Sequence, residues 1–447
     1  MTHGKDDMTE TGDARHAPKI DPSRRPARES KDARSVDDPG NPAIKEWARA
    51  GLDEPDLEVL RHYRLERIRA QLRERDFGGA LLYDPLNIRY ATDTMNMQVW
   101  CMHNAVRYCY IATDGPVVLF DFHNCEHLSH DYSTVDETRG AMAWFYFGAG
   151  PEEGKRVKLW AAEIAELVRA HGGGNMRLAI DKCDQLGIEA LQGEGVECHS
   201  SQAFTEEARK IKHPEEIKAM RRAINTSEMG MWAMWNGLAP GITENELWSI
   251  LHQVNIARGG EWIETRLLSS GPRTNPWFHE CSNRVIEAGD IVSFDTDLVG
   301  PYGYCSDISR AWVTPGKSPT NEQMAMHAMA MEQIGFNMEL LKPGLSFKEF
   351  ATKSYQLPEN YLPNRYSAIV HGVGLCDEYP SVAYPQDKKK GGYDGIFEAG
   401  MCICVESYIG RVGGAEGVKL ERQVLITENG NEVLDVFPMD LVPEVAT

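Results

Sequence analysis

The sequence predicts a mixed α/β (α+β) protein with more than one domain, and three observations support this fold class. The chain has 447 residues, which is more than one ordinary globular domain contains. Hydrophobic residues make up 42% of it and aromatic residues 9%, enough for large buried cores. Helix-like and strand-like hydrophobic patterns alternate along most of the chain, which is typical of α/β folds.

The first 205 residues divide into an arm and a folded domain. Residues 1–44 are rich in charged residues, Ser and Pro and almost free of aromatic residues, which is typical of a flexible arm. From residue 45 to 205 the hydrophobic pattern predicts a first folded domain. Its expected elements are helices over 64–75 and 155–170, a short helix after Asp184, strands over 79–83, 106–112, 116–122 and 176–180, and a turn at Asp84-Pro85.

Residues 206–447 are expected to form one domain with two similar halves. A long helix is predicted over 215–236, and a second one over 322–340. Each is followed by a Pro-Gly stop and then by a capping-box pattern, which is Thr243 with Glu246 in the first case and Ser346 with Glu349 in the second. The repeated order of helix, stop and cap indicates a weak internal duplication.

The charge and the cysteines of the chain limit its partners and its compartment. The formal net charge is -20, so no basic surface for general nucleic-acid binding is expected. No apolar stretch reaches the roughly 18–20 residues that a membrane span needs, and the N-terminus lacks the apolar region of a signal peptide. The 10 cysteines have no disulfide-scaffold spacing. We expect a cytoplasmic protein that binds neither nucleic acid nor membrane.

Three aspartates in one segment are candidate metal ligands. Asp295 and Asp297 lie in a strand-like stretch, and Asp307 follows a Gly-rich turn. Alternate residues of a strand project from the same face, so the three carboxylates are expected to meet. Carboxylates brought together repel one another and need cations or protons. Solvent-exposed turn aspartates, or the Asp-x-Asp of a sugar-nucleotide transferase, remain alternative interpretations of this segment.

His371, Glu406 and Glu421 favour the metal interpretation. Both glutamates lie in apolar, strand-like segments, where a carboxylate is rare unless it is paired or bound to a metal. His371 lies among small residues that leave room for a close approach. Together with the three aspartates, these residues offer five carboxylates and one imidazole, a set that suits two divalent ions bridged by carboxylates.

The order of these residues resembles the pita-bread metal site of the creatinase, prolidase and methionine aminopeptidase superfamily. Similar segments lie at 87–90, 209–221, 270–279 and 399–421, so the resemblance covers about residues 60–440. It implies a creatinase-like amino domain followed by a pseudo-symmetric pita-bread catalytic domain. It also implies metal binding by Asp307, His371, Glu406 and Glu421 together with Asp295 or Asp297. The spacing from Asp307 differs from the family's by one residue for either aspartate, so both are assigned to the site.

Asp377 departs from the pattern of the peptidases and points to another reaction. In the peptidases a second histidine follows the ligand histidine, whereas here Asp377 stands in that region and the stretch is one residue shorter. An ionised carboxylate cannot donate a hydrogen bond to a tetrahedral intermediate, but it can act as a base. This combination resembles the dimethylsulfoniopropionate (DMSP) lyases of the superfamily. The resemblance implies base-promoted β-elimination of DMSP to dimethyl sulfide and acrylate, with Asp377 and Tyr366 as catalytic residues.

The same resemblance sets the expected cofactors, partners and alternatives. We expect two divalent transition-metal ions, iron first and zinc or manganese as alternatives, and a small-molecule sulfonium substrate. We also expect a homodimer in which Trp100 or its neighbours cover the partner's site. The alternative function is an Xaa-Pro aminopeptidase or dipeptidase, or a creatinase-like C–N hydrolase, which the retained His279 favours. A non-catalytic binding module is a third class, although six candidate ligands argue against it.

Overall fold

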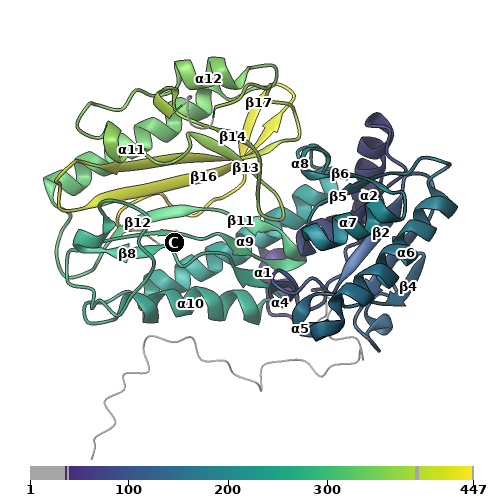
Figure 1. Ribbon diagram of the computed structural model, residues 1–447. Coiled ribbons are helices and arrows are strands. Elements are labelled where there is room, and N and C mark those ends of the chain that lie inside the picture. The colour runs from purple at the N-terminus through teal and green to yellow at the C-terminus, as the bar shows by residue number, and fades with distance from the viewer. Residues whose placement is uncertain (1–35, 38–39, 388–391, 445–447) are drawn as a thin grey trace, which may run out of the picture.

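The computed structural model describes residues 36–37, 40–387 and 392–444, arranged as an N-terminal and a C-terminal body side by side (Figure 1). Most of the arm expected at residues 1–44 lies outside the described residues. The short helix α1 (Ala43–Arg49) packs against the C-terminal body, where the indole of Trp47 donates a hydrogen bond to the carbonyl of Arg222. The domain boundaries expected near residues 44 and 205 stay predictions.

The N-terminal body is a six-stranded mixed sheet in the order β4-β3-β2-β1-β5-β6. Its strands are β1 (Gly79–Leu82), β2 (Tyr108–Ala112), β3 (Val117–Asp121), β4 (Glu137–Gly140), β5 (Arg177–Ile180) and β6 (Glu197–Ser200). Its helices are α2 (Leu57–Glu74), α3 (Pro85–Thr92), α4 (Gln98–Cys101), α5 (Tyr146–Ala149), α6 (Glu153–His171), α7 (Gln185–Gly193) and α8 (Gln202–Arg209). Successive strand residues face opposite sides, so Leu81 packs with Trp160 of α6 while Leu82 packs with Ile68 of α2.

One predicted turn in this body is wrong. Asp84 and Pro85 begin the helix α3 instead of reversing the chain. The Asp84 carboxylate accepts a hydrogen bond from the backbone N–H of Leu86, and Pro85 occupies the first helical turn, where a missing N–H costs nothing. An Asp-Pro pair is typical both of a turn and of the first residues of a helix. Here the apolar residues that follow favour the helix.

The C-terminal body consists of strands between two pairs of helices. Helices α9 (Pro214–Gly237) and α10 (Glu244–Ala257) lie below the strands in Figure 1, and α11 (Asn321–Leu340) and α12 (Phe347–Lys353) lie above them. The three sheets have the orders β12-β9-β8, β14-β13-β15-β16-β17 and β11-β10-β7. This arrangement agrees with the expected two-half domain. No described helix is both long enough and apolar enough to cross a membrane.

Eleven described strands form these three sheets, and some of them carry the candidate ligands. Their bounds are β7 (Trp262–Ile263), β8 (Leu268–Ser270), β9 (Ile291–Asp295), β10 (Leu298–Val299), β11 (Cys305–Ser306), β12 (Ser309–Val313), β13 (Val370–Val373), β14 (Asp377–Val382), β15 (Cys402–Gly410), β16 (Gly417–Thr427) and β17 (Gly430–Val433). The long strands β15 and β16 are buried over nearly all of their length, and they pair directly so that Glu406 lies opposite Glu421.

The two predicted helix caps differ in the structure. Thr243 and Glu246 form the complete capping box of α10, as predicted. Ser346 accepts a hydrogen bond from the N–H of Glu349, but the Glu349 side chain turns to Lys353 one helical turn later instead of closing the box. A carboxylate at this position can serve either partner, and here the i,i+4 lysine takes it.

Candidate metal centre

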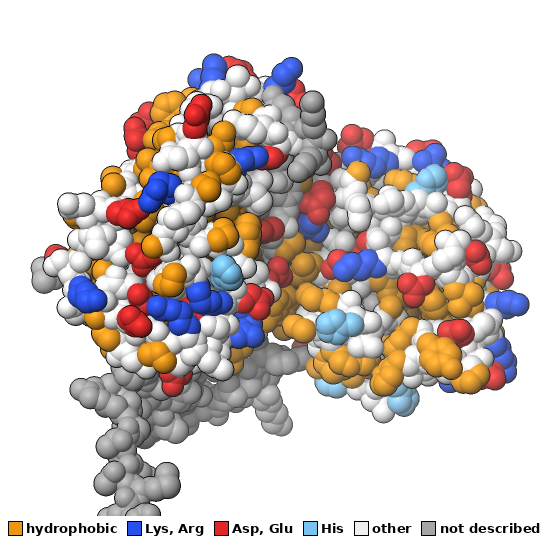
Figure 2. All heavy atoms as spheres, turned by 60° about the vertical axis from the view of Figure 1, so that its left-hand side comes forward, with side chains coloured by type: hydrophobic (Ala, Val, Ile, Leu, Met, Phe, Trp, Pro, Cys, Tyr) orange, Lys and Arg blue, Asp and Glu red, His pale blue; other side chains and the backbone are white. Residues whose placement is uncertain are grey.

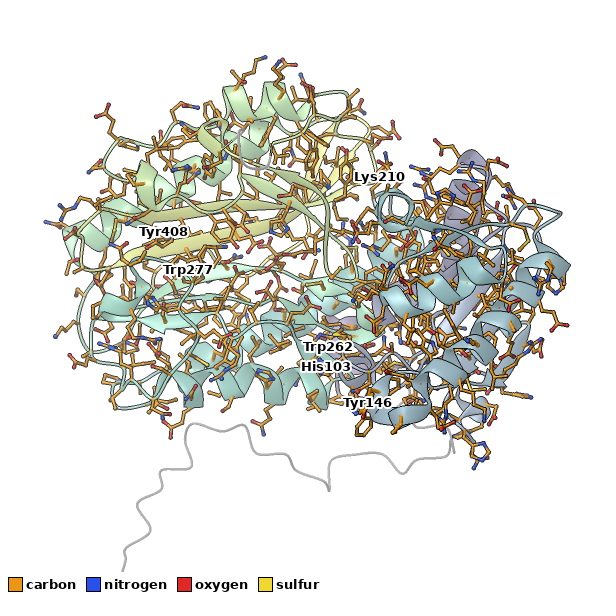
Figure 3. All side chains as sticks on the ribbon, in the orientation of Figure 1. His103, Tyr146, Lys210, Trp262, Trp277 and Tyr408 are labelled. Carbon is orange, nitrogen blue, oxygen red and sulfur yellow. The ribbon has the colours of Figure 1, made fainter. Side chains whose placement is uncertain are left out.

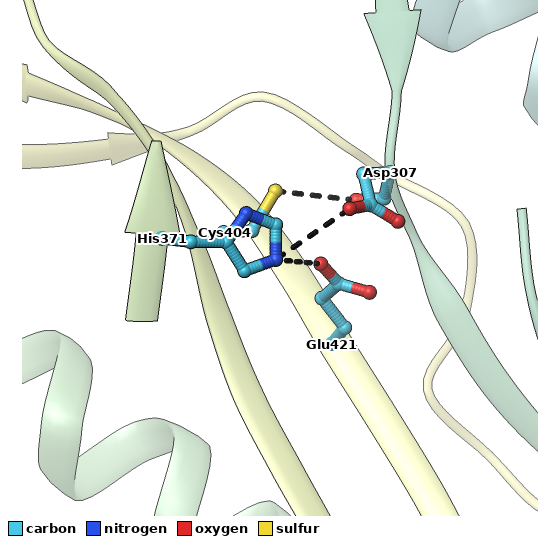
Figure 4. A group of neighbouring side chains, drawn as sticks. All are labelled: Asp307, His371, Cys404 and Glu421. Carbon is cyan, nitrogen blue, oxygen red and sulfur yellow. Dashed lines mark hydrogen bonds and ion pairs between the residues drawn. The ribbon is translucent and has the colours of Figure 1, made fainter. Parts of the chain in front are cut away.

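Six predicted side chains meet where β9, β13, β15 and β16 come together. The structure forms three overlapping groups whose potential ligand atoms lie within 4.8 Å of one another: Asp307, His371, Cys404 and Glu421; Asp295, Glu406 and Glu421; and Asp295, Asp297 and Asp307. Figure 4 shows the first of these groups. Asp295, Asp307 and Glu421 each belong to two groups, so the three groups form one cluster that shares carboxylates.

His371 presents one ring nitrogen to the carboxylates. Its Nε2 atom lies 3.1 Å from Oε1 of Glu406, 3.6 Å from Oδ2 of Asp307 and 3.7 Å from Oε1 of Glu421. Its Nδ1 atom lies 3.2 Å from the carbonyl oxygen of Gly372, which can only accept a hydrogen bond. Nδ1 therefore carries a proton, and a neutral ring would direct the lone pair of Nε2 at the cluster, as a metal ligand requires.

Asp295 and Asp297, whose spacing from Asp307 differs from that of the family, reach the cluster in different ways. Asp295 ends β9, and its Oδ1 accepts a 2.6 Å hydrogen bond from the hydroxyl of Ser309. Asp297 lies beyond the strand with a left-handed backbone angle φ of 37°, and its Oδ2 accepts a 2.5 Å hydrogen bond from Thr265. The prediction that Asp295 and Asp297 project from the same face of one strand is therefore wrong, because the strand ends at Asp295. A left-handed residue after the strand, not strand alternation, brings Asp297 to Asp307.

The cluster contains buried carboxyl oxygens that lack hydrogen-bond partners within the described part of the chain. Asp307 Oδ1 and Glu421 Oε1 are buried and have no hydrogen-bond partner among the described residues. Burial raises the pKa of both carboxyl groups far above their usual range, and neighbouring carboxylates add to the effect. Burial and Asp295 also raise the pKa of Asp297 to about 8. Buried carboxylate oxygens that lack a hydrogen-bond partner and repel one another are the donor set that divalent cations stabilise, so these residues fit the metal ions that the sequence predicts.

Lys419 is a member of the cluster that the sequence analysis missed. Its buried ammonium lies 2.6 Å from Oε2 of Glu406, 3.3 Å from Oε2 of Glu421 and 3.1 Å from Oδ2 of Asp295. Burial alone would raise the pKa of Asp295, but the ammonium of Lys419, together with hydrogen bonds to this carboxylate, outweighs this effect and the pKa is lowered to about 2. With all five carboxyl groups ionised, the ammonium leaves four negative charges, which two divalent ions would balance. Lys419 is two residues before Glu421 in β16, so strand alternation was the signal that could have found it.

Cys404 lies close to the candidate ligands. Its sulfur belongs to the group that Figure 4 draws, and it lies 3.8 Å from the backbone carbonyl of Asp307. Burial raises the pKa of the Cys404 thiol well above its usual range. The Cys404 sulfur thus lies among the potential ligand atoms, and its thiol can hydrogen-bond to the backbone carbonyl of Asp307.

The two predicted catalytic residues lie at the edge of the cluster. Oδ1 of Asp377 is 3.6 Å from Nδ1 of His371, and the Asp377 side chain is 57% exposed. The ring of Tyr366 lies 4.5 Å from the ammonium of Lys419, and it stacks on Phe278 with 5.4 Å between ring centroids. Phe278 is 55% exposed. The acidic cluster is thus bordered by one accessible carboxylate and by an aromatic pair.

The other aromatic residues near the motifs belong to the core. Trp277 is buried and lies beside Tyr408, with 6.0 Å between ring centroids (Figure 3). The hydroxyl of Tyr302 contacts Arg222, and the hydroxyl of Tyr304 donates a 2.7 Å hydrogen bond to Glu216. The hydroxyl groups of Tyr302 and Tyr304 are therefore satisfied away from the cluster, which separates these two residues from Tyr366 and Phe278.

The glycines after His371 make room for β14, not for a ligand. A Cβ atom on Gly372 would collide with the backbone oxygens of Glu378 and Tyr379, and one on Gly374 would collide with the carboxylate of Glu378. The expectation that small residues here allow something to approach closely is correct, but the neighbour is the chain's own next strand.

Comparisons with known proteins agree with this architecture. The model of metallopeptidase family M24 matches residues 218–428, and the model of the Creatinase/Prolidase N-terminal domain matches residues 64–211. The chain is 46% identical over 403 residues to a dimethylsulfoniopropionate lyase DddP of Roseovarius nubinhibens, covering 89% of this chain and 90% of the relative. It is 44% identical to the DddP of Roseobacter denitrificans over the same shares of both chains. The solved Xaa-Pro dipeptidase of Bacillus anthracis shares the fold, with a TM-score of 0.69, 22% identity, and coverage of 85% of this chain and 98% of that one.

Proposed function

The chain belongs to the metallopeptidase family M24, and we propose that within this family it is a metal-dependent lyase that cleaves DMSP to dimethyl sulfide and acrylate. The observation that carries this proposal is the 46% identity to a DMSP lyase over 89% of the chain. The accessible Asp377 beside His371 supports it, because this residue type suits proton abstraction better than amide hydrolysis.

The reaction is a β-elimination whose demands match the site. A base removes a proton from the carbon next to the substrate carboxylate. The electrons of that C–H bond form the new carbon–carbon double bond, and the electrons of the C–S bond leave with the sulfur. The sulfonium departs as neutral dimethyl sulfide and needs no general acid, so one carboxylate base suffices for the proton transfer.

We assign the metal ions to the six predicted side chains: Asp295, Asp297, Asp307, His371, Glu406 and Glu421. The groups of ligand atoms within 4.8 Å and the two buried oxygens without a hydrogen-bond partner support the assignment. Two divalent ions bound there would attract the substrate carboxylate and stabilise the negative charge that develops as the proton leaves. Iron is our first choice of metal, with zinc or manganese as alternatives, because carboxylate-rich sites with one imidazole accept each of them.

We assign the base to Asp377. The Nδ1 proton of His371 goes to the carbonyl of Gly372, so the imidazole does not need Asp377 to fix its orientation. The separation of 3.6 Å between Asp377 and that nitrogen is too long for a hydrogen bond. Asp377 is therefore a solvent-accessible carboxylate at the border of the cluster, able to take a proton from a substrate whose carboxylate reaches the acidic side chains through cations.

The aromatic pair is suited to the other end of the substrate. Tyr366 and Phe278 stack at the edge of the cluster, and Phe278 leaves part of its surface exposed. Aromatic faces attract organic cations, and the sulfonium carries the positive charge of DMSP. Lys419 already lies on the Tyr366 ring, so we assign the sulfonium to the exposed surface of Phe278 and give Tyr366 the role of supporting that ring.

We further propose a homodimer in the cytoplasm. Hydrophobic side chains gather on the N-terminal body in Figure 2, and Met97 and Phe147 are 53% and 80% exposed. The segment 95–100 lines a cavity of about 870 Å³ between the bodies, and Trp100 belongs to this lining. An exposed apolar surface of this kind is typical of a protein interface, which supports coverage of the partner's site by this segment. All ten cysteines are free thiols, which suits a reducing compartment.

The test is a direct product assay. Metal-loaded full-length protein is incubated with DMSP, and dimethyl sulfide is measured in the headspace while acrylate is measured in solution. The same sample is given proline-containing dipeptides. Equal amounts of dimethyl sulfide and acrylate without peptide cleavage would support the lyase, whereas peptide cleavage without dimethyl sulfide would show that the hydrolase alternative is correct.

A further inference from the structure

We propose that Arg209 and Lys212 are positioning residues that fix Asp377 at His371 by holding the buried carboxylate of Glu378. This inference rests on the proposed function, since it assigns a role in the same reaction. Arg209 and Lys212 belong to the segment 209–217, which resembles the family in sequence. This segment contributes no candidate ligand to the metal centre, so its role needs another explanation.

Glu378 is held from two sides by cations. Its side chain is 1% exposed, and its Oε2 lies 3.1 Å from Nε of Arg209. Its Oε1 accepts a hydrogen bond from the ammonium of Lys212, which itself is 2% exposed. Burial raises the pKa of the Glu378 carboxyl, and Lys212 and Arg209 act in the opposite direction. A buried carboxylate with two buried cations is a rigid anchor, because moving any one of them leaves the others unpaired.

A third contact holds the backbone of the same strand. Oε2 of Glu206, within α8, accepts a 2.9 Å hydrogen bond from the N–H of Tyr379. The other oxygen of Glu206 accepts from Arg209, so the same arginine orients both acidic partners. Side chains of α8 and of the linker after it therefore bind two successive residues of β14, Glu378 and Tyr379.

The strand pairing relates the position of Glu378 to that of Asp377 in the site. In the ladder between β13 and β14, Glu378 lies opposite Gly372 and Asp377 lies opposite Val373, with an irregularity between His371 and Gly372. Side chains alternate along a strand, so Glu378 is buried on one side of β14 while Asp377 is exposed on the other. Fixing Glu378 therefore fixes the direction in which Asp377 leaves the strand.

The same network ties the N-terminal body to the candidate base. Arg209 donates a hydrogen bond to Oδ1 of Asn87 in α3, and Nδ2 of Asn87 donates a 3.1 Å hydrogen bond to Asp181 after β5. Asp181 in turn accepts from the backbone N–H groups of Tyr83 and Asp84. The chain of contacts runs from the end of the N-terminal sheet to the residue beside Asp377, so the placement of the two bodies bears on the geometry of the base.

Lys210 provides a matched control in the same linker. It lies between the two positioning residues in sequence and is labelled in Figure 3. Its ammonium binds Glu207 at 2.7 Å and Glu398 at 2.6 Å, and neither partner belongs to β14. Lys210→Met thus removes a lysine from the same segment whose ion pairs lie outside the strand that carries Asp377.

The experiment compares Lys212→Met, Glu378→Gln, their combination and Lys210→Met as metal-loaded full-length proteins. We expect Lys212→Met and Glu378→Gln to keep their metal content and their KM for DMSP within about threefold, while kcat falls about tenfold or more, because misplacing a base by a fraction of an ångström reduces turnover and not binding. The combined variant should lose little more than either single variant, since both changes break one contact. Lys210→Met should keep the wild-type kcat.

The outcomes separate this inference from the proposed function. Glu378→Gln changes no heavy-atom volume, so it is the variant to rely on if Lys212→Met does not fold. A wild-type kcat in Glu378→Gln, or equal losses in Lys212→Met and Lys210→Met, would overturn the positioning role while the wild type still releases dimethyl sulfide. Absence of dimethyl sulfide from the wild type would overturn the proposed function and the positioning role with it.

Discussion

Oδ1 of Asp377 lies 3.6 Å from Nδ1 of His371, the ring nitrogen that does not face the acidic cluster. The other ring nitrogen lies 3.1 Å from Glu406. His371 thus stands between the candidate metal ligands on one side and the candidate base on the other. In the proposed reaction the substrate carboxylate binds on the first side and the base acts from the second.

Removing one candidate ligand should empty the metal centre. We expect Glu406→Ala to lower the metal content from up to two ions per chain and to abolish lyase activity, because Glu406 faces both His371 and Lys419 in the cluster. Elemental analysis of the purified protein measures this. Cys404→Ala is the matched control from the same strand and should keep its metal. Full occupancy in both Glu406→Ala and Asp307→Ala would mean that other residues bind the ions.

Lys419 should matter most to the metal-free protein. Lys419→Met removes the ammonium that contacts Asp295, Glu406 and Glu421, so the metal-free variant should lose about 3–5 kcal/mol in the free energy of unfolding, as broken buried ion pairs do. Divalent ions should recover much of this loss by binding the folded state. Denaturant unfolding with and without a chelator measures both values. An equal loss in the two conditions would contradict the electrostatic role.

Glu228 should make stability fall as pH rises. Burial raises its pKa to about 7, although its carboxylate accepts hydrogen bonds from the N–H groups of Val436 and Phe437. The folded state then binds the proton more tightly than the unfolded state, so this contribution is complete below the unfolded pKa near 4.5 and is lost by about pH 7.

Glu228→Gln tests that sign. The amide oxygen can still accept from the backbone but has no charge to bury, so the variant should gain about 3 kcal/mol over the wild type between pH 4.5 and pH 8, a difference that follows from the size of the pKa shift. Urea unfolding of both proteins along this pH range measures the difference. A constant difference across the range would show that Glu228 titrates alike in both states.

A charge in the exposed segment before α4 should separate the proposed dimer. We expect Met97→Asp to give a monomer in light scattering and to lower the lyase rate about tenfold or more, because the segment would no longer complete the partner's site. Val436→Asp alters a residue that is 79% exposed in the C-terminal body and serves as the control. A wild-type protein that is monomeric and fully active at micromolar concentration would exclude the dimer.

Much of the fold could be predicted because it depends on local pattern. The strands that carry Glu406 and Glu421, and the cap at Thr243, follow from hydrophobic runs and short-range hydrogen bonds. Asp297 was assigned to the cluster for the wrong reason, because a left-handed residue after a strand leaves no periodic signal.

The parts that could not be predicted depend on distant residues. Arg209 meets Glu378 across 169 positions of sequence, and no pattern within either segment indicates the other. Lys419 was recognisable only through its two-residue spacing from Glu421, which becomes informative once Glu421 is known to face the cluster. A buried charge whose partners come from another strand needs the assembled sheet to be recognised.

The most direct test of the central claim is the lyase rate of Asp377→Asn. The variant keeps the shape of the side chain and removes the base, so it should bind metal as the wild type does and lose several orders of magnitude in the release of dimethyl sulfide. Asp377→His should not restore the lyase. A near wild-type rate in metal-loaded Asp377→Asn would show that the base lies elsewhere, with Tyr366 the next residue to examine, and would contradict the proposed mechanism.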